Sequence, residues 1–318
     1  MRFVMGVVIG CSIIGLLWIL LIIGQVGCPT PSSRWVYEVI QKKVRIAQQT
    51  PSPKVVISGG SNVLFGVDST MLAQYFGRPV VNMGVNAALQ VPVILETTKL
   101  VLQAGDTLFL ALEYPDLYEY DGKPNFQEID YILARAPWIL QSLSWKEKIY
   151  LIWETPFLRV LQGYKCDEGK PVRAGPYGAH RINLLGDETL TWPVPNAYRN
   201  AVKKSKPKPF VSVESLEYKR VWVILRRFKQ WCHQHGIRFF LIPAVIRDFP
   251  DYHKDRAIAF LNALPHIASH YGLIFLGEPK DFMYGIDDLY NTPYHLNARG
   301  RIVHTKRLID LFQQNGIR

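Results

Sequence analysis

The sequence predicts an α/β protein in which a parallel β-sheet carries helices on both faces, so that the fold has three layers. Strand-like and helix-like segments alternate along much of the 318-residue chain, and repeated alternation of this kind is typical of a parallel sheet. The strand-like segments are short apolar runs, as in residues 54–58, which is the pattern of strands buried on both faces. A charge-free segment at the amino terminus adds a membrane-spanning helix to this prediction.

The amino-terminal segment has the composition of a membrane anchor. Residues 3–27 contain no charged side chain and are rich in Ile, Leu, Val and Gly, and a helix of this length crosses the hydrocarbon core of a bilayer. A cleaved signal peptide would have a shorter apolar core and a small-residue cleavage site, and no good site is visible. We therefore predict an uncleaved transmembrane anchor over residues 1–27, with cleavage or lipidation at Cys28 as the alternatives.

The next segment is expected to connect the anchor to the folded domain. Residues 28–53 begin with a Pro- and Ser-containing stretch, continue as a basic helical pattern from Trp35 and end on a second Pro-containing stretch. We interpret them as a linker with a stalk helix. Residues 54–318 are predicted to form one α/β domain, since such a domain with one large insertion accommodates this length. The insertion is placed at residues 116–211, where the alternation stops.

The first half of the α/β domain supplies three predicted strands. After the strand at 54–58, residues 68–76 form a short helix, because Asp68 or Ser69 can cap it. Residues 80–84 form the second strand. A helix from about 91 to 103 follows and ends before Gly105, as helices often do. Residues 106–112 form the third strand.

The insertion differs in pattern from its surroundings. Residues 126–161 are helical in pattern and rich in Trp, Tyr, Leu and Ile, whereas residues 163–209 read as loops. An insertion with apolar helices of its own suits a lid over the site, a surface lying on the bilayer, or a docking site for a membrane partner. Added core packing is the simplest alternative.

The alternation resumes after the insertion. A helix capped by Ser212 carries apolar residues at helical spacing and ends before Gly236. The helix after it is expected to stop before Pro265, because proline has no N–H to donate within a helix. The expected elements from there are strand 237–245, helix 254–264, strand 273–277 and helix 298–313.

Two residues far apart in the sequence are predicted to form a catalytic pair. Ser61 follows the first strand and two glycines, which allow the chain to turn sharply, and His295 lies just before the last helix. Loops that follow different strands of a parallel sheet meet at its carboxyl edge, so both residues belong to that edge. A serine hydroxyl becomes a strong nucleophile when a base takes its proton, and histidine is such a base at neutral pH.

The same residues carry a resemblance to a known superfamily. The Gly-x-Ser-Asn turn at residues 59–62 and the His-Leu-Asn-x-x-Gly run at residues 295–300 resemble the SGNH/GDSL hydrolases. The likeness is closest to the membrane-anchored branch that includes alginate O-acetylation proteins and the D-alanyl transfer protein of teichoic acids. It covers about residues 52–114 and 213–318. It implies a flavodoxin-like three-layer sandwich and an acyl-enzyme intermediate on Ser61.

The resemblance also implies donors for the oxyanion that forms during acyl transfer. Gly84 matches a glycine whose backbone N–H is one of these donors. The superfamily takes a further donor from an asparagine after the third strand, and this chain has Glu113 in that region. A carboxylate there would hinder catalysis unless it were protonated or turned aside. Asn62, Asn82 and Asn86 are candidate substitutes.

The acidic member of the expected triad departs from the superfamily as well. The usual aspartate three residues before the histidine is replaced here by Thr292. Asp288 is our first candidate for the group that orients His295, and Asn291 is the second. An asparagine can hold the imidazole by a hydrogen bond, but it cannot stabilise an imidazolium electrostatically.

These observations predict serine-dependent acyl transfer or ester hydrolysis on a cell-surface polysaccharide or another polymer, outside the cytoplasm in the periplasm or at the cell surface. One alternative is a degenerate SGNH scaffold that binds glycan or a membrane acyltransferase without catalysis; another is a free-standing esterase or lipase. In the superfamily, the implied partner is an integral membrane O-acyltransferase. The net charge of +11 favours an anionic polysaccharide or lipid surface, and no nucleic-acid-binding module is recognisable.

Metal ions, cofactors and disulfides are not expected. His266 and His270 are spaced like a helical metal pair, but no carboxylate or cysteine cluster accompanies them, and no glycine-rich nucleotide motif occurs. Of the four cysteines, only Cys166 and Cys232 are placed to form a bridge outside the membrane. We favour two unrelated thiols.

Overall fold

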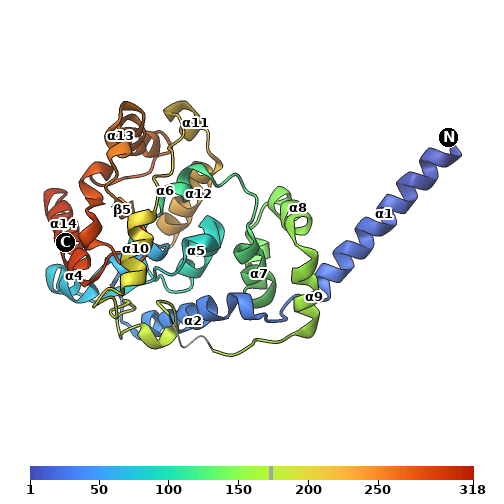
Figure 1. Ribbon diagram of the computed structural model, residues 1–318, viewed down its shortest axis with the longest axis horizontal. Helices are drawn as coiled ribbons and strands as arrows, with labels where there is room; N and C mark the ends of the chain where they lie inside the picture. Colours follow the sequence, from blue (N-terminus) through green and yellow to red (C-terminus); the bar gives the residue numbers. More distant parts are fainter. Residues whose placement is uncertain (172–174) are drawn as a thin grey trace. The chain divides into compact units, whose positions relative to one another are not determined.

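The computed structural model describes residues 1–171 and 175–318 and divides into two compact units (Figure 1). The first unit comprises Met1–Tyr37 and Gly122–Val172, and the second comprises Glu38–Asp121 and Arg173–Arg318. The insertion predicted over 116–211 is therefore shared between the two units. Its residues 172–174 lie outside the described part of the chain.

The second unit is built on a four-stranded parallel sheet with the strand order β2-β1-β3-β4. In this order the chain moves outward from β1 in both directions, as in doubly wound α/β folds. The strands are β1 (Val55–Gly59), β2 (Val80–Asn82), β3 (Thr107–Ala111) and β4 (Arg238–Leu241). The first four predicted strands are confirmed.

The fifth predicted strand, at residues 273–277, is reduced to one parallel bridge between Leu241 and Phe275. The bridge places this segment beside β4, which extends the order toward the flavodoxin-like arrangement. A separate pair of short parallel strands, β5 (Ile246–Arg247) and β6 (Met283–Tyr284), was not predicted.

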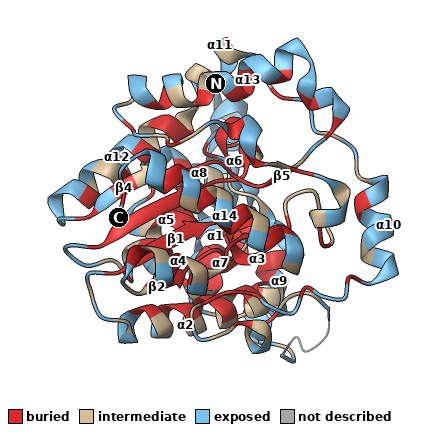
Figure 2. Cartoon of the chain, turned by 90° about the vertical axis from the view of Figure 1, so that its left-hand side faces the viewer, coloured by how far each residue is buried: buried red, intermediate tan, exposed pale blue. Residues whose placement is uncertain are grey.

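Helices lie on both faces of the sheet. The helices of this unit are α3 (Ser61–Gly66), α4 (Ser69–Phe76), α5 (Gln90–Lys99), α6 (Tyr114–Tyr118), α10 (Asn196–Lys204), α11 (Val213–Glu217), α12 (Arg220–Gln234), α13 (Asp255–His270) and α14 (Ala298–Gln314). On one face, the ring of Phe109 packs against Phe76 of α4 and Phe312 of α14, with centroids 5.9 and 4.3 Å apart. On the other face, Ser58 Oγ of β1 lies 2.6 Å from Thr98 Oγ1 of α5. Figure 2 shows the strands between these helices largely buried.

Helix α13 does not stop before Pro265, as we had expected, but continues through it to His270. Proline removes one hydrogen bond from a helix. Three apolar side chains around it, Leu261, Leu264 and Ile267, are buried in the core. This burial stabilises the helix on both sides of the proline.

The helix expected as a stalk is packed against protein. Helix α2 (Arg34–Gln49) carries Val39, Ile40, Lys43 and Ala47 at helical spacing, and all four side chains are buried. A helix with one buried stripe of this kind belongs to a folded domain.

The first unit contains α1 (Arg2–Ile23), α7 (Phe126–Arg135), α8 (Trp145–Glu154) and α9 (Phe157–Lys165). Within α1, Phe3–Ile23 is long and apolar enough to cross a membrane, which fits an anchor or a signal sequence. The interior of the unit holds an ion pair between Asp130 of α7 and Arg159 of α9, whose side chains are both fully buried. Thr30 Oγ1 donates a hydrogen bond of 2.7 Å to the same carboxylate.

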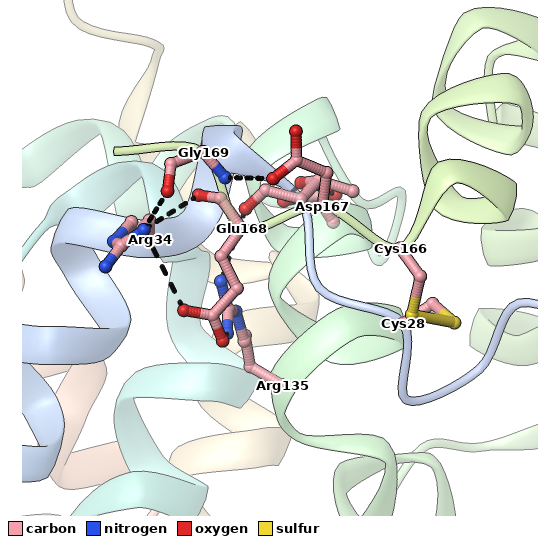
Figure 3. Close-up of polar contacts among 9 residues, drawn as sticks. Cys28, Arg34, Arg135, Cys166, Asp167, Glu168 and Gly169 are labelled. Atoms are coloured by element: carbon pink, nitrogen blue, oxygen red, sulfur yellow. Dashed lines mark hydrogen bonds and ion pairs between the residues drawn. A yellow bond between two sulfur atoms is a disulfide. The ribbon is translucent and has the colours of Figure 1, made fainter. Parts of the chain in front are cut away.

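The prediction of unrelated thiols is wrong, because Cys166 forms a disulfide with Cys28 (Figure 3). Gly27, just before Cys28, donates its N–H to the carbonyl of Leu133 over 2.7 Å, which turns the chain leaving α1 back onto α7. This turn brings Cys28 to the end of α9. The bridge leaves no thiol on Cys28 for lipidation, and Cys232 is a buried free cysteine.

Polar contacts surround this bridge. Figure 3 shows the side chains of Arg34 and Arg135 directed at the carboxylate of Glu168. The distance from Arg135 Nη1 to Glu168 Oε1 is 2.9 Å, and that from Arg34 Nη1 to Glu168 Oε2 is 3.9 Å. The carboxylate is about half exposed, with 49% of its side-chain surface accessible. This cluster joins the start of α2 to the segment after α9.

Candidate active site

Ser61 is the first residue of α3 and follows β1 at the carboxyl edge of the sheet. The backbone reaches this position through two glycines, Gly59 and Gly60, that pass very close to neighbouring residues. A Cβ on Gly59, whose φ is +156°, would lie 2.2 Å from the carbonyl oxygen of Ala111, and a Cβ on Gly60 would lie 2.8 Å from the Cβ of Ala87. Only glycine therefore fits where the chain leaves β1 so close to its neighbours.

The hydroxyl of Ser61 donates a hydrogen bond of 2.9 Å to Glu113 Oε1, which also accepts the backbone N–H of Asn62 over 3.2 Å. The parallel register explains this meeting. Gly59 of β1 pairs with Ala111 of β3, so the residues two positions further along each chain, Ser61 and Glu113, come side by side. Ser61 is 9% exposed and Glu113 is 7% exposed.

In the sequence, Glu113 stands out only as a departure from the SGNH pattern. The signal that could have found it is an acidic residue just past a fully buried strand, next to the strand that leads to Ser61. A carboxylate that accepts a hydrogen bond from a serine hydroxyl is also placed to accept its proton, a role that the sequence pattern did not suggest.

Burial raises the pKa of Glu113, while the hydrogen bonds from Ser61 and Asn62 and the charge of Lys208 act in the opposite direction. The pKa of nearby Asp116 is raised well above its ordinary value, first by burial and then by the charge of Glu113. Two neighbouring carboxyl groups do not readily ionise together. We infer that Asp116 keeps its proton when Glu113 ionises.

His295 lies on the same side of α3 as Ser61. Its ring stacks on Phe65, with centroids 4.3 Å apart, and Phe65 is one helical turn beyond Ser61. The ring of Tyr177 meets His295 edge-on at a centroid distance of 6.3 Å. Burial raises the pKa of Tyr177, and the charge of Glu113 acts in the same direction. These contacts gather Ser61, Glu113 and His295 into one region. Within the described part of the chain, no hydrogen bond joins Ser61 to His295.

Asn291, our second candidate, forms a hydrogen bond with the His295 ring. Its Oδ1 lies 2.6 Å from His295 Nδ1, and because an amide oxygen only accepts, the Nδ1 atom carries the proton. The Nε2 atom then presents a lone pair. Burial lowers the pKa of His295 to about 3, so the ring is neutral at physiological pH. Tyr177 forms a further hydrogen bond with the Asn291 side chain.

Asp288, our first candidate, is engaged elsewhere. Its carboxylate pairs with Arg299 at the start of α14, with Arg299 Nε 3.0 Å from Asp288 Oδ1. Its backbone carbonyl accepts the N–H of Asn297 over 2.9 Å. Asp288 therefore stabilises the loop between β6 and α14, whereas Asn291 orients the imidazole.

The expected oxyanion donors form internal hydrogen bonds. The Gly84 N–H donates to Asn82 Oδ1 over 2.9 Å, and Asn62 Nδ2 donates to the Ala111 carbonyl over 3.2 Å. Asn86 Oδ1 accepts the Ala88 N–H over 3.1 Å as the cap of a short 3₁₀ turn. The Gly84 N–H and the Asn62 side-chain amide are thus occupied in this state.

Asn82 belongs to a buried network next to the site. Its side chain donates to Asp187 Oδ1 over 3.0 Å and lies 3.2 Å from Lys43 Nζ. Lys43 is fully buried, and its ammonium also donates to the carbonyl of Gly84. Burial lowers the pKa of Lys43 to about 7, although the charges of Asp187 and Glu188 oppose the shift.

The buried Lys43 should make the free energy of unfolding depend on pH, and Lys43→Met should remove this dependence. Because the pKa of Lys43 falls from 10.5 to about 7 on folding, the unfolded chain binds one more proton than the folded chain between these values. The free energy of unfolding should therefore rise with pH in this interval, by up to about 1.4 kcal/mol per pH unit. Urea unfolding at several pH values measures this slope. Lys42→Met is the control and should retain it, and an unchanged slope in Lys43→Met would contradict the prediction.

Comparisons with known proteins add a distant structural likeness. The chain matches no protein-family model and no curated protein. It is similar to a solved structure described as "a putative platelet activating factor from Streptococcus pneumonia", at 13% identity and a TM-score of 0.38, over 86% of this chain and 90% of that one. It is also similar to "a possible lipase from Chitinophaga pinensis DSM 2588", at 12% identity and a TM-score of 0.32, over 83% of this chain and 99% of that one. Likeness at this level leaves the function to be argued from the site residues themselves.

Proposed function

We propose that this protein forms an acyl-enzyme on Ser61 and passes the acyl group to water or to a hydroxyl of a cell-surface polysaccharide. The observation that carries the proposal is the 2.9 Å hydrogen bond from Ser61 Oγ to Glu113 Oε1 at the carboxyl edge of the sheet. A nucleophilic serine needs a proton acceptor within this distance.

The proposed reaction has two half-reactions. In the first, Glu113 takes the proton of Ser61 while Oγ attacks the acyl carbonyl carbon, and the same carboxyl group then returns the proton to the departing alcohol. In the second, water or a sugar hydroxyl attacks the acyl carbon and gives its proton to Glu113, which passes it to Oγ as Ser61 is released. The neutral His295, held by Asn291, offers the Nε2 lone pair as a hydrogen-bond acceptor for the incoming hydroxyl.

The proposed setting is the outer side of a membrane. The disulfide between Cys28 and Cys166 supports it, because such bonds persist in oxidising compartments. The net charge of +11 supports an anionic polysaccharide or lipid surface as partner. An integral membrane O-acyltransferase is the acyl donor that the SGNH resemblance implies. A free-standing esterase or lipase would use the same residues with water as the acceptor.

A second candidate function is binding of glycan or of a membrane acyltransferase without catalysis. The observation that favours it is the internal use of two of the expected oxyanion donors, the Gly84 N–H and the Asn62 side-chain amide, in this state. The two candidates differ in the reactivity of Ser61.

A fluorophosphonate probe tests the reactivity of Ser61 in the full-length, detergent-solubilised protein. We expect covalent labelling that peptide mapping assigns to Ser61 and that disappears in Ser61→Ala. Ser58→Ala is the matched control, because this serine lies in β1, three residues before Ser61, and its hydroxyl contacts Thr98. This variant should be labelled like the wild type. A folded wild-type protein that takes up no label would support the binding function instead.

A further inference from the structure

The first unit exposes a row of large apolar side chains along α8 and α9, which we call the hairpin face. The side chains recur at helical spacing in both helices, and the opposite sides carry the buried Leu151 and Val160. Trp153 is 81% exposed and Leu158 is 61% exposed. A contiguous row of this kind marks a surface that contacts lipid or protein. Its members are Trp145, Ile149, Trp153, Phe157, Leu158, Leu161 and Tyr164.

Helices α8 and α9 lie near the carboxyl-terminal end of the apolar helix α1 (Figure 1). Trp18 of α1 donates its indole N–H to the carbonyl of Ile152 in α8 over 3.0 Å, and its ring stacks on Phe157 of α9 at 6.4 Å. The disulfide of Cys28 and Cys166 ties the end of α9 to the residues that follow α1. The hairpin is thereby attached to the carboxyl-terminal end of the apolar helix.

When α1 spans a membrane, the contact at Trp18 lies within the apolar layer. Trp18 lies five residues before Ile23, the last residue of the apolar span. At 1.5 Å of rise per residue, the contact is about 8 Å inside the end of the span. Amphipathic helices that lie in a membrane interface bury their apolar faces to about 5–10 Å.

The residue types of the hairpin also fit the interface between lipid and water. Tryptophan and tyrosine are enriched at that depth, and three of the seven side chains of the hairpin face are of these types. Exposed lysines accompany them, namely Lys146, Lys148 and Lys165. The Lys146 ammonium lies 5.8 Å from the centroid of the Trp145 ring. Lysines next to an apolar face are attracted to anionic lipid head groups.

We propose that α8 and α9 form an interfacial membrane element, with the hairpin face inserted among lipid acyl chains in the leaflet that contains the carboxyl-terminal end of α1. Lipid is the occupant because the hairpin face continues the exposed apolar surface of α1 at the same depth. The proposal is independent of the chemistry at Ser61. It assigns this part of the insertion a role in holding the first unit at the membrane surface.

Site-directed spin labelling of the full chain tests the proposal. Single labels at Trp153→Cys and Leu158→Cys are introduced in a Cys11→Ser background, which removes the exposed free thiol and leaves the buried Cys232. The protein is reconstituted in vesicles of phosphatidylethanolamine and phosphatidylglycerol. Tyr218→Cys, which is 79% exposed in the second unit, is the control. Collisions of each label with molecular oxygen, which partitions into lipid, and with a water-soluble nickel chelate are measured.

We expect frequent collisions with oxygen and a loss of collisions with the nickel chelate at positions 153 and 158, and the reverse at position 218. Nickel accessibility at positions 153 and 158 equal to that at 218 would place the hairpin face in water and overturn the proposal. Protection of these labels from both reagents would also overturn it, because protein and not lipid would then cover the face. Measurement at two positions guards against a local effect of either substitution.

Discussion

Replacing Glu113 by glutamine is expected to lower the rate of Ser61 acylation about 10²–10⁴-fold, the range typical of a lost general base. The glutamine side chain keeps an oxygen that can accept the hydrogen bond of Ser61, but it cannot take up the proton. The rate of fluorophosphonate labelling, or of hydrolysis of an activated ester, measures the effect. Glu119→Gln is the control, because this carboxylate is 54% exposed and pairs with Lys208; its rate should match that of the wild type.

The pH dependence of the same rate identifies the form of Glu113 that acts. In the proposed mechanism acylation requires the ionised carboxylate, so the rate should rise with pH as Glu113 loses its proton. Burial raises the pKa of Glu113 above 4.5, so this rise should lie above that of an ordinary glutamate. His295 stays neutral above about pH 3 and does not contribute there. The rise should be absent in Glu113→Gln. A rate that falls with increasing pH would mean that protonated Glu113 is the active form.

A second large effect is expected on the stability of the first unit. Asp130→Ala would leave the guanidinium of Arg159 buried without its carboxylate. Removing one member of a buried ion pair typically costs about 3–5 kcal/mol, because the remaining charge stays out of water. Hydrogen exchange of the α7 backbone amides in the full-length protein measures the local free energy of opening.

Glu168→Ala provides the matched comparison for this effect. It also breaks an ion pair in the first unit, with Arg135, but the Glu168 side chain is 49% exposed. Water and salt screen such a pair, so we expect a loss of at most about 1 kcal/mol. An equal decrease of the opening free energy in the two variants would show that burial of the Asp130–Arg159 pair does not increase its contribution to stability.

The parts of the fold that local patterns encode could be predicted from the sequence. The first four strands were predicted because each is a short apolar run, and the final helix was predicted to within one residue of α14. The expectations that failed depend on contacts made elsewhere in the chain. Helix α13 continues past Pro265, where we expected it to end, because the side chains around the proline pack in the core. The segment at 273–277 forms only one bridge to β4, although its apolar pattern resembles that of the other strands.

In the candidate site, too, one feature could be predicted from the sequence and another could not. The position of Ser61 could be predicted because a short apolar run followed by Gly59 and Gly60 is visible in the sequence. The close approach of Ala111 and Ala87, which restricts both positions to glycine, appears only in the structure. The partner of His295 could not be chosen from the sequence, because Asp288 and Asn291 both lie within reach along the loop. In the structure, Asp288 forms an ion pair with Arg299, and Asn291 forms the hydrogen bond with the imidazole.

By itself the sequence determined the class of fold, the apolar character of α1 and the position of Ser61 at the carboxyl edge of the sheet, because helical and strand periodicity and glycine turns act over a few residues. Only the tertiary structure decided that Ser61 faces Glu113 and that Cys28 pairs with Cys166. The first depends on the register that sets Gly59 beside Ala111, and the second on the turn that docks Gly27 onto α7. Both contacts join residues far apart in the chain, and no local sequence pattern specifies which distant residue will form the contact.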